Sequence, residues 1–141
     1  MQSAQNLKVL LVDDSAVLKQ RIAALIGSVE HVQLVGIADT EESAVETAKR
    51  EAVDVIILDL HLRQGSGFGV MRSLAASALK PRIIVFTNYD LPEYQKIATE
   101  LGAAYFLDKS RDFGQVPALL QECMLSQAPT SEAVQLSSVG N

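Results

Sequence analysis

The fold is decided by the stretch Leu7-Lys8-Val9-Leu10-Leu11-Val12-Asp13-Asp14, in which an apolar run ends on two carboxylates. Short runs of Val, Ile and Leu are typical of buried strands. Charged residues also follow two later apolar runs: Asp59 comes after residues 53–58, and Lys109 comes after residues 105–107. If these runs are parallel strands, their carboxyl ends meet at one edge of a sheet, where three carboxylates and one ammonium gather.

A cluster of this kind needs compensation for its negative charge. Two unit charges about 4 Å apart interact by about 4 kcal/mol at an effective dielectric constant near 20. The cluster must therefore bind a cation or partly neutralise itself. A magnesium-dependent phosphoryl site explains the pattern, because Mg²⁺ prefers oxygen ligands and neutralises phosphoryl charge.

Strand-like runs alternate along the chain with segments whose apolar residues recur at helical spacing. We expect strands at residues 7–12, 32–38, 53–58, 82–87 and 104–108. Alternation with helices is the pattern of repeated βαβ units, so we predict an α/β fold around a parallel sheet. The five helical stripes are Leu18, Ile22, Leu25 and Ile26; Ala44, Val45 and Ala48; Val70, Met71, Leu74, Ala75 and Ala78; Tyr94, Ile97, Ala98 and Leu101; and Val116, Leu119, Leu120, Cys123 and Met124.

Capping residues support these helices. Hydrogen-bonding side chains that favour helix starts stand before the first two helices, Asp14 or Ser15 for the first and Asp39 or Thr40 for the second. Gly102 can end the fourth helix in a left-handed conformation. Pro117 requires the fifth helix to begin only shortly before it, because proline is tolerated in a first turn.

Composition fits one globular domain. The chain has 141 residues, of which 48% are hydrophobic and 21% charged. We expect a folded domain over residues 1–125 and a flexible tail, or the start of a linker, over residues 126–141, where the helical period is lost. The net charge of -5 argues against direct binding of DNA or RNA, which basic proteins achieve through phosphate contacts.

The chain carries a single cysteine, Cys123, which cannot form an internal disulfide. Its apolar neighbours favour a packing role in a reduced compartment. Residues 1–6 lack the features of a signal peptide, and no apolar run approaches the roughly 18 residues needed to span a bilayer. We therefore expect a cytoplasmic protein with no membrane partner.

Five polar side chains fall at or just beyond the predicted strand ends: Asp13, Asp14, Asp59, Thr87 and Lys109. Ligands of open parallel sheets bind at this edge. Each residue also has an ordinary interpretation, with Asp14 as a helix cap, Thr87 as a strand residue and Lys109 as a solvated charge. Together they place a useful polar group at four of the five strand ends, which favours one shared site.

With these residues the chain resembles the receiver domain of two-component response regulators, a family that includes chemotaxis receivers, over about residues 7–125. The resemblance rests on the acidic pair Asp13 and Asp14, the strand-end Asp59, the later Gly67, the hydroxyl of Thr87, and Gly102-Ala103 followed by Lys109. It implies a flavodoxin-like, doubly wound (βα)5 fold with five parallel strands in the order 2-1-3-4-5.

The resemblance also implies a function. Asp59 is the expected phosphoacceptor, and the donor is a histidine kinase or a histidine phosphotransfer protein. Mg²⁺ is the implied cofactor, held by Asp14, Asp59 and the backbone carbonyl of His61, with Asp13 acting mostly through water. Such a domain is not a conventional enzyme, although it assists its own phosphorylation and dephosphorylation.

Lys109 and Thr87 are implied to meet the phosphoryl oxygens and to bias a two-state loop arrangement. In the family, an aromatic residue three before the lysine moves with the threonine. That position is Phe106, and alternation along a strand puts its neighbour Tyr105 on the other face of the sheet. We expect Phe106 to be the coupled ring. The output face is then the fourth helix, fifth strand and fifth helix, which binds a downstream protein or a second copy of the chain.

Three positions depart from the family pattern. Ser110 follows the lysine where proline is usual, often after a cis bond, and a cis bond before a non-proline residue costs ~3 kcal/mol, so we predict a trans bond. Arg63 stands where proline is common. Asn88 follows the threonine where a very small residue is usual, and with Tyr89 it is predicted to narrow access to the phosphoacceptor.

Other features have simpler interpretations. His31 and His61 have no Cys or His neighbour at metal-ligand spacing, so we expect surface histidines. The glycines at 65, 67 and 69 are not followed by Gly-Lys-Ser/Thr, and we expect them to shape the turn into the third helix.

Three other functions remain open at this stage. An aspartyl phosphohydrolase would need an Asp-x-Asp after the first strand, which Asp13-Asp14-Ser15 lacks. A flavin binder would face repulsion between its phosphate and the acidic first loop. A receiver-like interaction module that no longer uses phosphate is the third.

Overall fold

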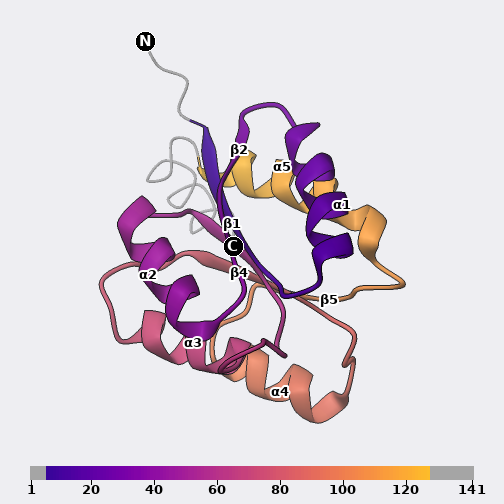
Figure 1. The fold of residues 1–141 in the computed structure, drawn as a ribbon. Coiled ribbons are helices and arrows are strands. Elements are labelled where there is room, and N and C mark those ends of the chain that lie inside the picture. Colours follow the sequence, from indigo (N-terminus) through magenta and orange to yellow (C-terminus); the bar gives the residue numbers. More distant parts are fainter. Residues whose placement is uncertain (1–5, 128–141) are drawn as a thin grey trace, which may run out of the picture.

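The computed structural model describes residues 6–127, which form one parallel sheet with helices on both faces (Figure 1). The strand order is β2-β1-β3-β4-β5, which confirms the predicted topology. The elements in chain order are β1 (Leu7–Val12), α1 (Ala16–Gly27), β2 (Val32–Ala38), α2 (Glu41–Glu51), β3 (Val55–Leu58), α3 (Gly67–Ala75), β4 (Arg82–Thr87), α4 (Pro92–Glu100), β5 (Tyr105–Asp108), the 3-10 helix η1 (Phe113–Gln115) and α5 (Val116–Gln127).

Two strands begin later than the sequence predicted. β3 starts at Val55 rather than at residue 53, because the amide of Val53 still donates to the carbonyl of Ala48 at the end of α2. β5 starts at Tyr105 rather than at residue 104, although the amide of Ala104 already donates to the carbonyl of Ile83 at 2.8 Å. The carboxyl ends of the strands, which carry the candidate site, are unaffected.

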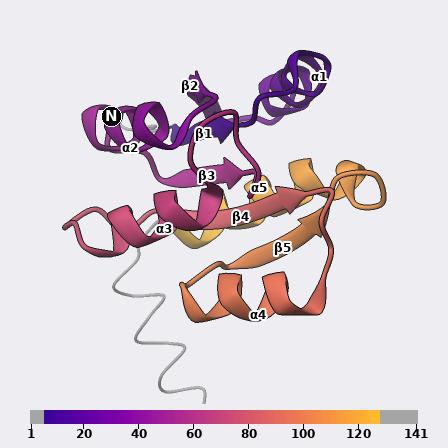
Figure 2. The same cartoon turned by 60° about the horizontal axis from the view of Figure 1, so that its bottom comes forward.

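The sheet divides the core into two layers, because residues along each strand alternate between its faces. Helices α1 and α5 lie together on one face, packed on Val9, Leu11, Ile57, Ile84 and Phe86 (Figure 1). Helices α2, α3 and α4 cover the other face, over Leu10, Val12, Ile56, Leu58 and Val85 (Figures 1 and 2). Burial on both faces explains why the central strands read as continuous apolar runs.

Helix starts follow the capping signals. Ser15 caps α1 by accepting from the amide of Leu18, and Thr40 caps α2 by accepting from the amide of Ser43. Of the pairs of candidate caps that the sequence offers, the structure thus selects Ser15 over Asp14 and Thr40 over Asp39. Gly102 follows α4 with a φ of +99°, as predicted, in a conformation that favours glycine.

Two helix ends differ from the predictions. The third apolar stripe predicts a helix as far as Ala78, but α3 ends at Ala75, and the hydroxyl of Ser77 donates to the carbonyl of Leu74 just beyond it. Ala75 and Ala78 are exposed. Helix α5 starts at Val116, directly before Pro117 as predicted, and continues to Gln127, two residues into the segment expected as a tail. The rest of that segment lies outside the described residues.

Cys123 is buried in the layer beneath α1 and α5, as its apolar neighbours predicted. In the part of the chain that the structure describes, every helix is too short or too polar to cross a membrane.

Candidate functional site

The polar residues at the strand ends are held by backbone bonds that continue the sheet. The amide of Asp13 donates to the carbonyl of Ala38, and the amide of Asp59 donates to the carbonyl of Val12. The amide of Lys109 donates to the carbonyl of Thr87 at 3.0 Å. The sheet therefore brings together residues far apart in the sequence, as the strand-end pattern predicted.

Lys109 lies between two carboxylates. Its Nζ is 2.7 Å from Oδ2 of Asp13 and 2.9 Å from Oδ2 of Asp59. All three side chains are nearly inaccessible, with exposed fractions of 8%, 2% and 7% respectively. Lys109 is thus a buried counter-charge at the centre of the site, and its interpretation as a solvated loop charge is wrong.

Burial and pairing act in opposite directions on these groups. Burial raises the pKa of Asp59, and the hydrogen bond from Lys109 offsets this only in part. Burial disfavours charge on Lys109 as well, but its hydrogen bonds to Asp13 and Asp59 outweigh that effect and raise the pKa of the ammonium. The site therefore holds a firmly charged lysine beside a carboxylate whose ionised form is disfavoured.

The site has the donor set for a magnesium ion. Asp13, Asp14 and Asp59 each offer a carboxylate oxygen, and these atoms lie within 4.8 Å of one another. Asp14 is exposed, whereas the other two are buried, so the cluster opens to solvent on one side. Carboxylate oxygens facing water suit Mg²⁺, which binds a few carboxylates and keeps several waters.

The remaining predicted residues lie at the same edge. Thr87 is fully buried, and its hydroxyl accepts from the amide of Tyr89 at 3.2 Å. The amide of His61 donates to Oδ1 of Asp59 at 3.3 Å. The ring of His61 is exposed, as expected, and packs on Tyr89 with ring centroids 3.8 Å apart. The loops after β3 and β4 thus touch beside the carboxylates.

The glycines before α3 have a packing role that the sequence only partly revealed. A Cβ on Gly67 would lie 2.5 Å from the carbonyl oxygen of Asp59, so a side chain there would displace the loop. Side chains at Gly65 and Gly69 would collide with Glu41, whose carboxylate accepts from the amide of Ser66 at 3.0 Å. Helix α2 therefore fixes the loop that follows Asp59.

Phe106 and Tyr105 point to opposite faces of the sheet, as alternation predicted. Phe106 is half-buried and packs in the layer that contains α4. Tyr105 packs on the α5 side, where its hydroxyl donates to Glu122 at 2.6 Å. This hydrogen bond favours the neutral phenol and raises the pKa of Tyr105 to about 12.

The loop after Lys109 has trans peptide bonds, as expected for Ser110 in place of proline. Arg63, another departure, pairs with Asp39 at 3.3 Å on the surface.

A family model described as the response regulator receiver domain matches residues 9–121. The chain belongs to this family.

Curated relatives and solved structures agree with that assignment. The receiver is 34% identical over 110 residues to protein-glutamate methylesterase/protein-glutamine glutaminase 5 of Myxococcus xanthus, covering 77% of this chain and 32% of that protein. The chain thus spans about a third of the length of the methylesterases that it matches.

Among solved structures, the response regulator domain of Thermotoga maritima CheB has a TM-score of 0.75, with 26% identity over 86% of this chain and 96% of that one. The receiver domain of NarL from Mycobacterium tuberculosis has a TM-score of 0.79, covers 85% of this chain and 97% of that one, and at 24% identity shows the fold alone. Receivers accept phosphoryl groups, and the family assignment therefore makes this chain a phosphoacceptor regulator.

Several residues around this site are not indicated by the sequence pattern. Glu41 holds the loop after Asp59, and Arg63 pairs with Asp39. Arg111 bridges two loops at the edge of the site. The glycines around residue 67 were the one sequence signal for the contact of Glu41 with this loop. The contacts of Arg63 and Arg111 depend on how separate loops are placed in space.

Proposed function

We propose that this receiver accepts a phosphoryl group on Asp59 from the phosphohistidine of a histidine kinase or a histidine phosphotransfer protein. The observation that carries the proposal is the buried Lys109 held 2.7 and 2.9 Å from Asp13 and Asp59 at the carboxyl edge of the sheet. Phosphoryl transfer depends mainly on positioning and on neutralising charge, and this arrangement supplies both.

An oxygen of Asp59 attacks the phosphorus atom, and the bond between phosphorus and the donor imidazole breaks. The bonding electrons leave with the imidazole nitrogen, which takes up a proton. Asp14, Asp59 and the backbone carbonyl of His61 would hold Mg²⁺, with Asp13 acting mostly through water. When bound, Mg²⁺ would neutralise charge on the phosphoryl oxygens.

Lys109 and Thr87 meet the new phosphoryl group in this proposal. The added charge of about -1.5 to -2 attracts the ammonium of Lys109 and the hydroxyl of Thr87. Thr87 would then release its bond to the amide of Tyr89 and draw the following loop toward Asp59. Phe106, packed on the α4 side, would follow this change.

The output face in this proposal is formed by α4, β5 and α5, and it binds a downstream protein or a second copy of the receiver. The proposed exchange with a histidine kinase or phosphotransfer protein would take place in the cytoplasm, and the buried thiol of Cys123 fits a reduced compartment. A phosphate-independent module is not favoured, because all five polar groups of the site are retained.

Intact mass tests the proposal directly. Incubation with Mg²⁺ and phosphoramidate, whose bond between phosphorus and nitrogen resembles that of phosphohistidine, is expected to add one phosphate. A promiscuous histidine kinase serves as a second donor, and a chelator is expected to prevent the addition with both. A protein that stays unmodified with both donors in Mg²⁺ would contradict the proposal.

Asn88 is expected to limit access to Asp59. It is exposed in the loop after Thr87, and the neighbouring Tyr89 already covers His61. An Asn88→Ala variant is therefore expected to gain phosphate from phosphoramidate several times faster and to lose it to water faster. Time courses of intact mass measure both rates, and unchanged rates in this variant would rule out the narrowing effect.

A further inference from the structure

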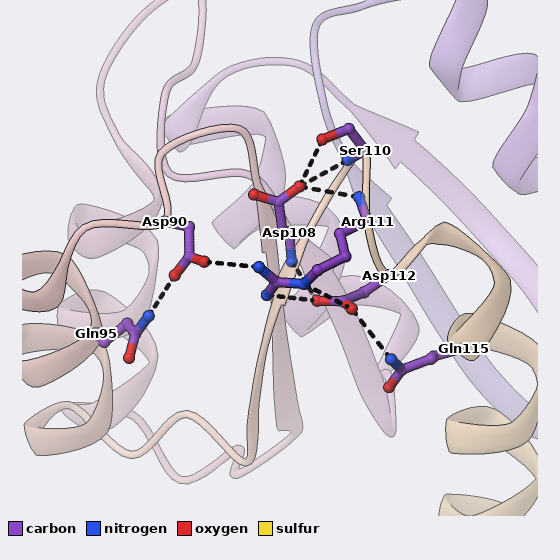
Figure 3. Close-up of polar contacts among 7 residues, drawn as sticks. All are labelled: Asp90, Gln95, Asp108, Ser110, Arg111, Asp112 and Gln115. Carbon is purple, nitrogen blue, oxygen red and sulfur yellow. Dashed lines mark hydrogen bonds and ion pairs between the residues drawn. The ribbon is translucent and has the colours of Figure 1, made fainter.

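The loop beyond Lys109 is organised by two aspartates (Figure 3). Asp108 accepts from the amides of Ser110 and Arg111 and from the Ser110 hydroxyl, at distances of 2.7 to 3.0 Å. Asp112 is buried and accepts from the amide of Asp108 at 2.9 Å. These bonds fix the backbone that carries Lys109 on its inner side.

Arg111 connects this loop to another one. Its Nε and Nη2 donate to the two oxygens of Asp112 at 3.2 and 3.1 Å. Its Nη1 donates to Asp90 at 3.2 Å. Figure 3 shows the guanidinium between the two carboxylates. A planar guanidinium can serve two carboxylates at once through its fixed fork of donors, which a lysine ammonium lacks.

The two bridged carboxylates belong to the loops that begin at Thr87 and Lys109. Asp90 lies three residues after Thr87 and also accepts from Gln95 of α4. Asp112 also accepts from Gln115, directly before α5, at 3.0 Å. One guanidinium therefore joins the loops of both phosphoryl-contacting residues and, through two glutamines, the starts of α4 and α5 (Figure 3).

We propose that Arg111 is a positioning residue whose bridge between Asp90 and Asp112 makes the loops of Thr87 and Lys109 respond to the phosphoryl group as one unit. This inference rests on the proposed phosphorylation of Asp59. Without the bridge the two loops are ordered separately when a phosphoryl group binds. The loss of conformational entropy on binding is then larger, and the affinity of the site for the phosphoryl group is lower. Because the Arg111 side chain is 65% exposed, the expected effect is about threefold and not all-or-none.

The test is a double-mutant cycle with Asp90→Asn and Arg111→Gln. The readout is the beryllofluoride concentration, in the presence of Mg²⁺, that half-saturates protection of amides 88–91 from hydrogen exchange. Each single variant is expected to raise this concentration about threefold, and the double variant is expected to raise it no further than either single variant does.

An Arg111→Lys variant tests the guanidinium fork and is expected to behave like Arg111→Gln. Arg50→Gln, which removes another exposed pair, Arg50 with Glu51 at 3.3 Å on α2, is the matched control and should match wild type.

Each alternative outcome has a distinct meaning. Additive effects of Asp90→Asn and Arg111→Gln would overturn the bridge while leaving the proposed function intact. An Arg111→Lys variant that behaves like wild type would overturn the role of the guanidinium fork. Failure of the wild-type protein to respond to beryllofluoride and Mg²⁺ would overturn the proposed function itself, before any variant is compared, and the inference with it.

Discussion

An Asp59→Asn variant is expected to acquire no phosphate from phosphoramidate or from a histidine kinase under conditions in which the wild type acquires one. The amide of asparagine cannot act as the nucleophile, and the site then offers no second acceptor in the same place. Asp13 also contacts Lys109, but its other carboxylate oxygen accepts a hydrogen bond from the amide of Ser15 at 2.8 Å. Intact mass of both proteins measures the difference, and a phosphate on the variant would identify a different acceptor.

The same variant is expected to fold and, at neutral pH, to be more stable than the wild type. Because burial raises the pKa of Asp59, the folded state holds the Asp59 proton more tightly than the unfolded chain does. This contribution to stability is complete below the ordinary pKa of 3.8 and is lost as the pH rises through the raised value. Asparagine does not ionise, so the Asp59→Asn variant is expected to keep this contribution to stability at neutral pH.

Melting temperatures measured in chelator across pH test this expectation. The variant should melt higher than the wild type near pH 7, and the difference should shrink toward zero as the pH falls below the ordinary pKa of an aspartate. Lys109 stays charged throughout this range and keeps its contact with Asp13 in the variant. A difference that grows toward acidic pH would show that the carboxylate stabilises the fold.

The sheet and the centre of the site could be predicted because both depend on local patterns. Apolar runs ending on Asp13, Asp59 and Lys109 identified the strands, and parallel strands must place their ends at one edge. Capping was equally local, so that Ser15 and Thr40 were among the expected caps. The errors at the start of β3 and at the end of α3 arose where loop residues bond back to a preceding helix.

The contacts that join separate loops could not be predicted in the same way. Nothing near Arg111 in the sequence points to Asp90, which lies 21 positions earlier. Glu41 reads as a favourable first-turn residue of α2, and its bond to the amide of Ser66 depends on how α2 packs beside α3. Such contacts follow from the arrangement of the sheet, so they become visible only once the strands and helices are placed.

A Lys109→Met variant is expected to be strongly destabilised in the absence of Mg²⁺. Methionine has a similar length but no charge, and it would leave Asp13 and Asp59 buried without their shared cation. Removing one partner of a buried ion pair costs 3–5 kcal/mol in general, so we expect a loss of about 3 kcal/mol and a melting temperature lower by about 10 °C. Thermal unfolding in chelator measures this loss.

Magnesium should restore much of that stability if the carboxylates form the proposed site. An ion bound by Asp14 and Asp59 would replace part of the missing positive charge, so the stabilisation by Mg²⁺ is expected to be larger in Lys109→Met than in the wild type. Phosphorylation should nevertheless be slowed by about 100-fold, because a positioned charge at the phosphoryl group is lost. Lys96→Met, at an exposed position on α4, is the matched control and should leave all three quantities near their wild-type values. If Mg²⁺ stabilises Lys109→Met no more than the wild type, the carboxylates do not bind the ion in the way proposed, and Lys109 is then mainly a structural counter-charge.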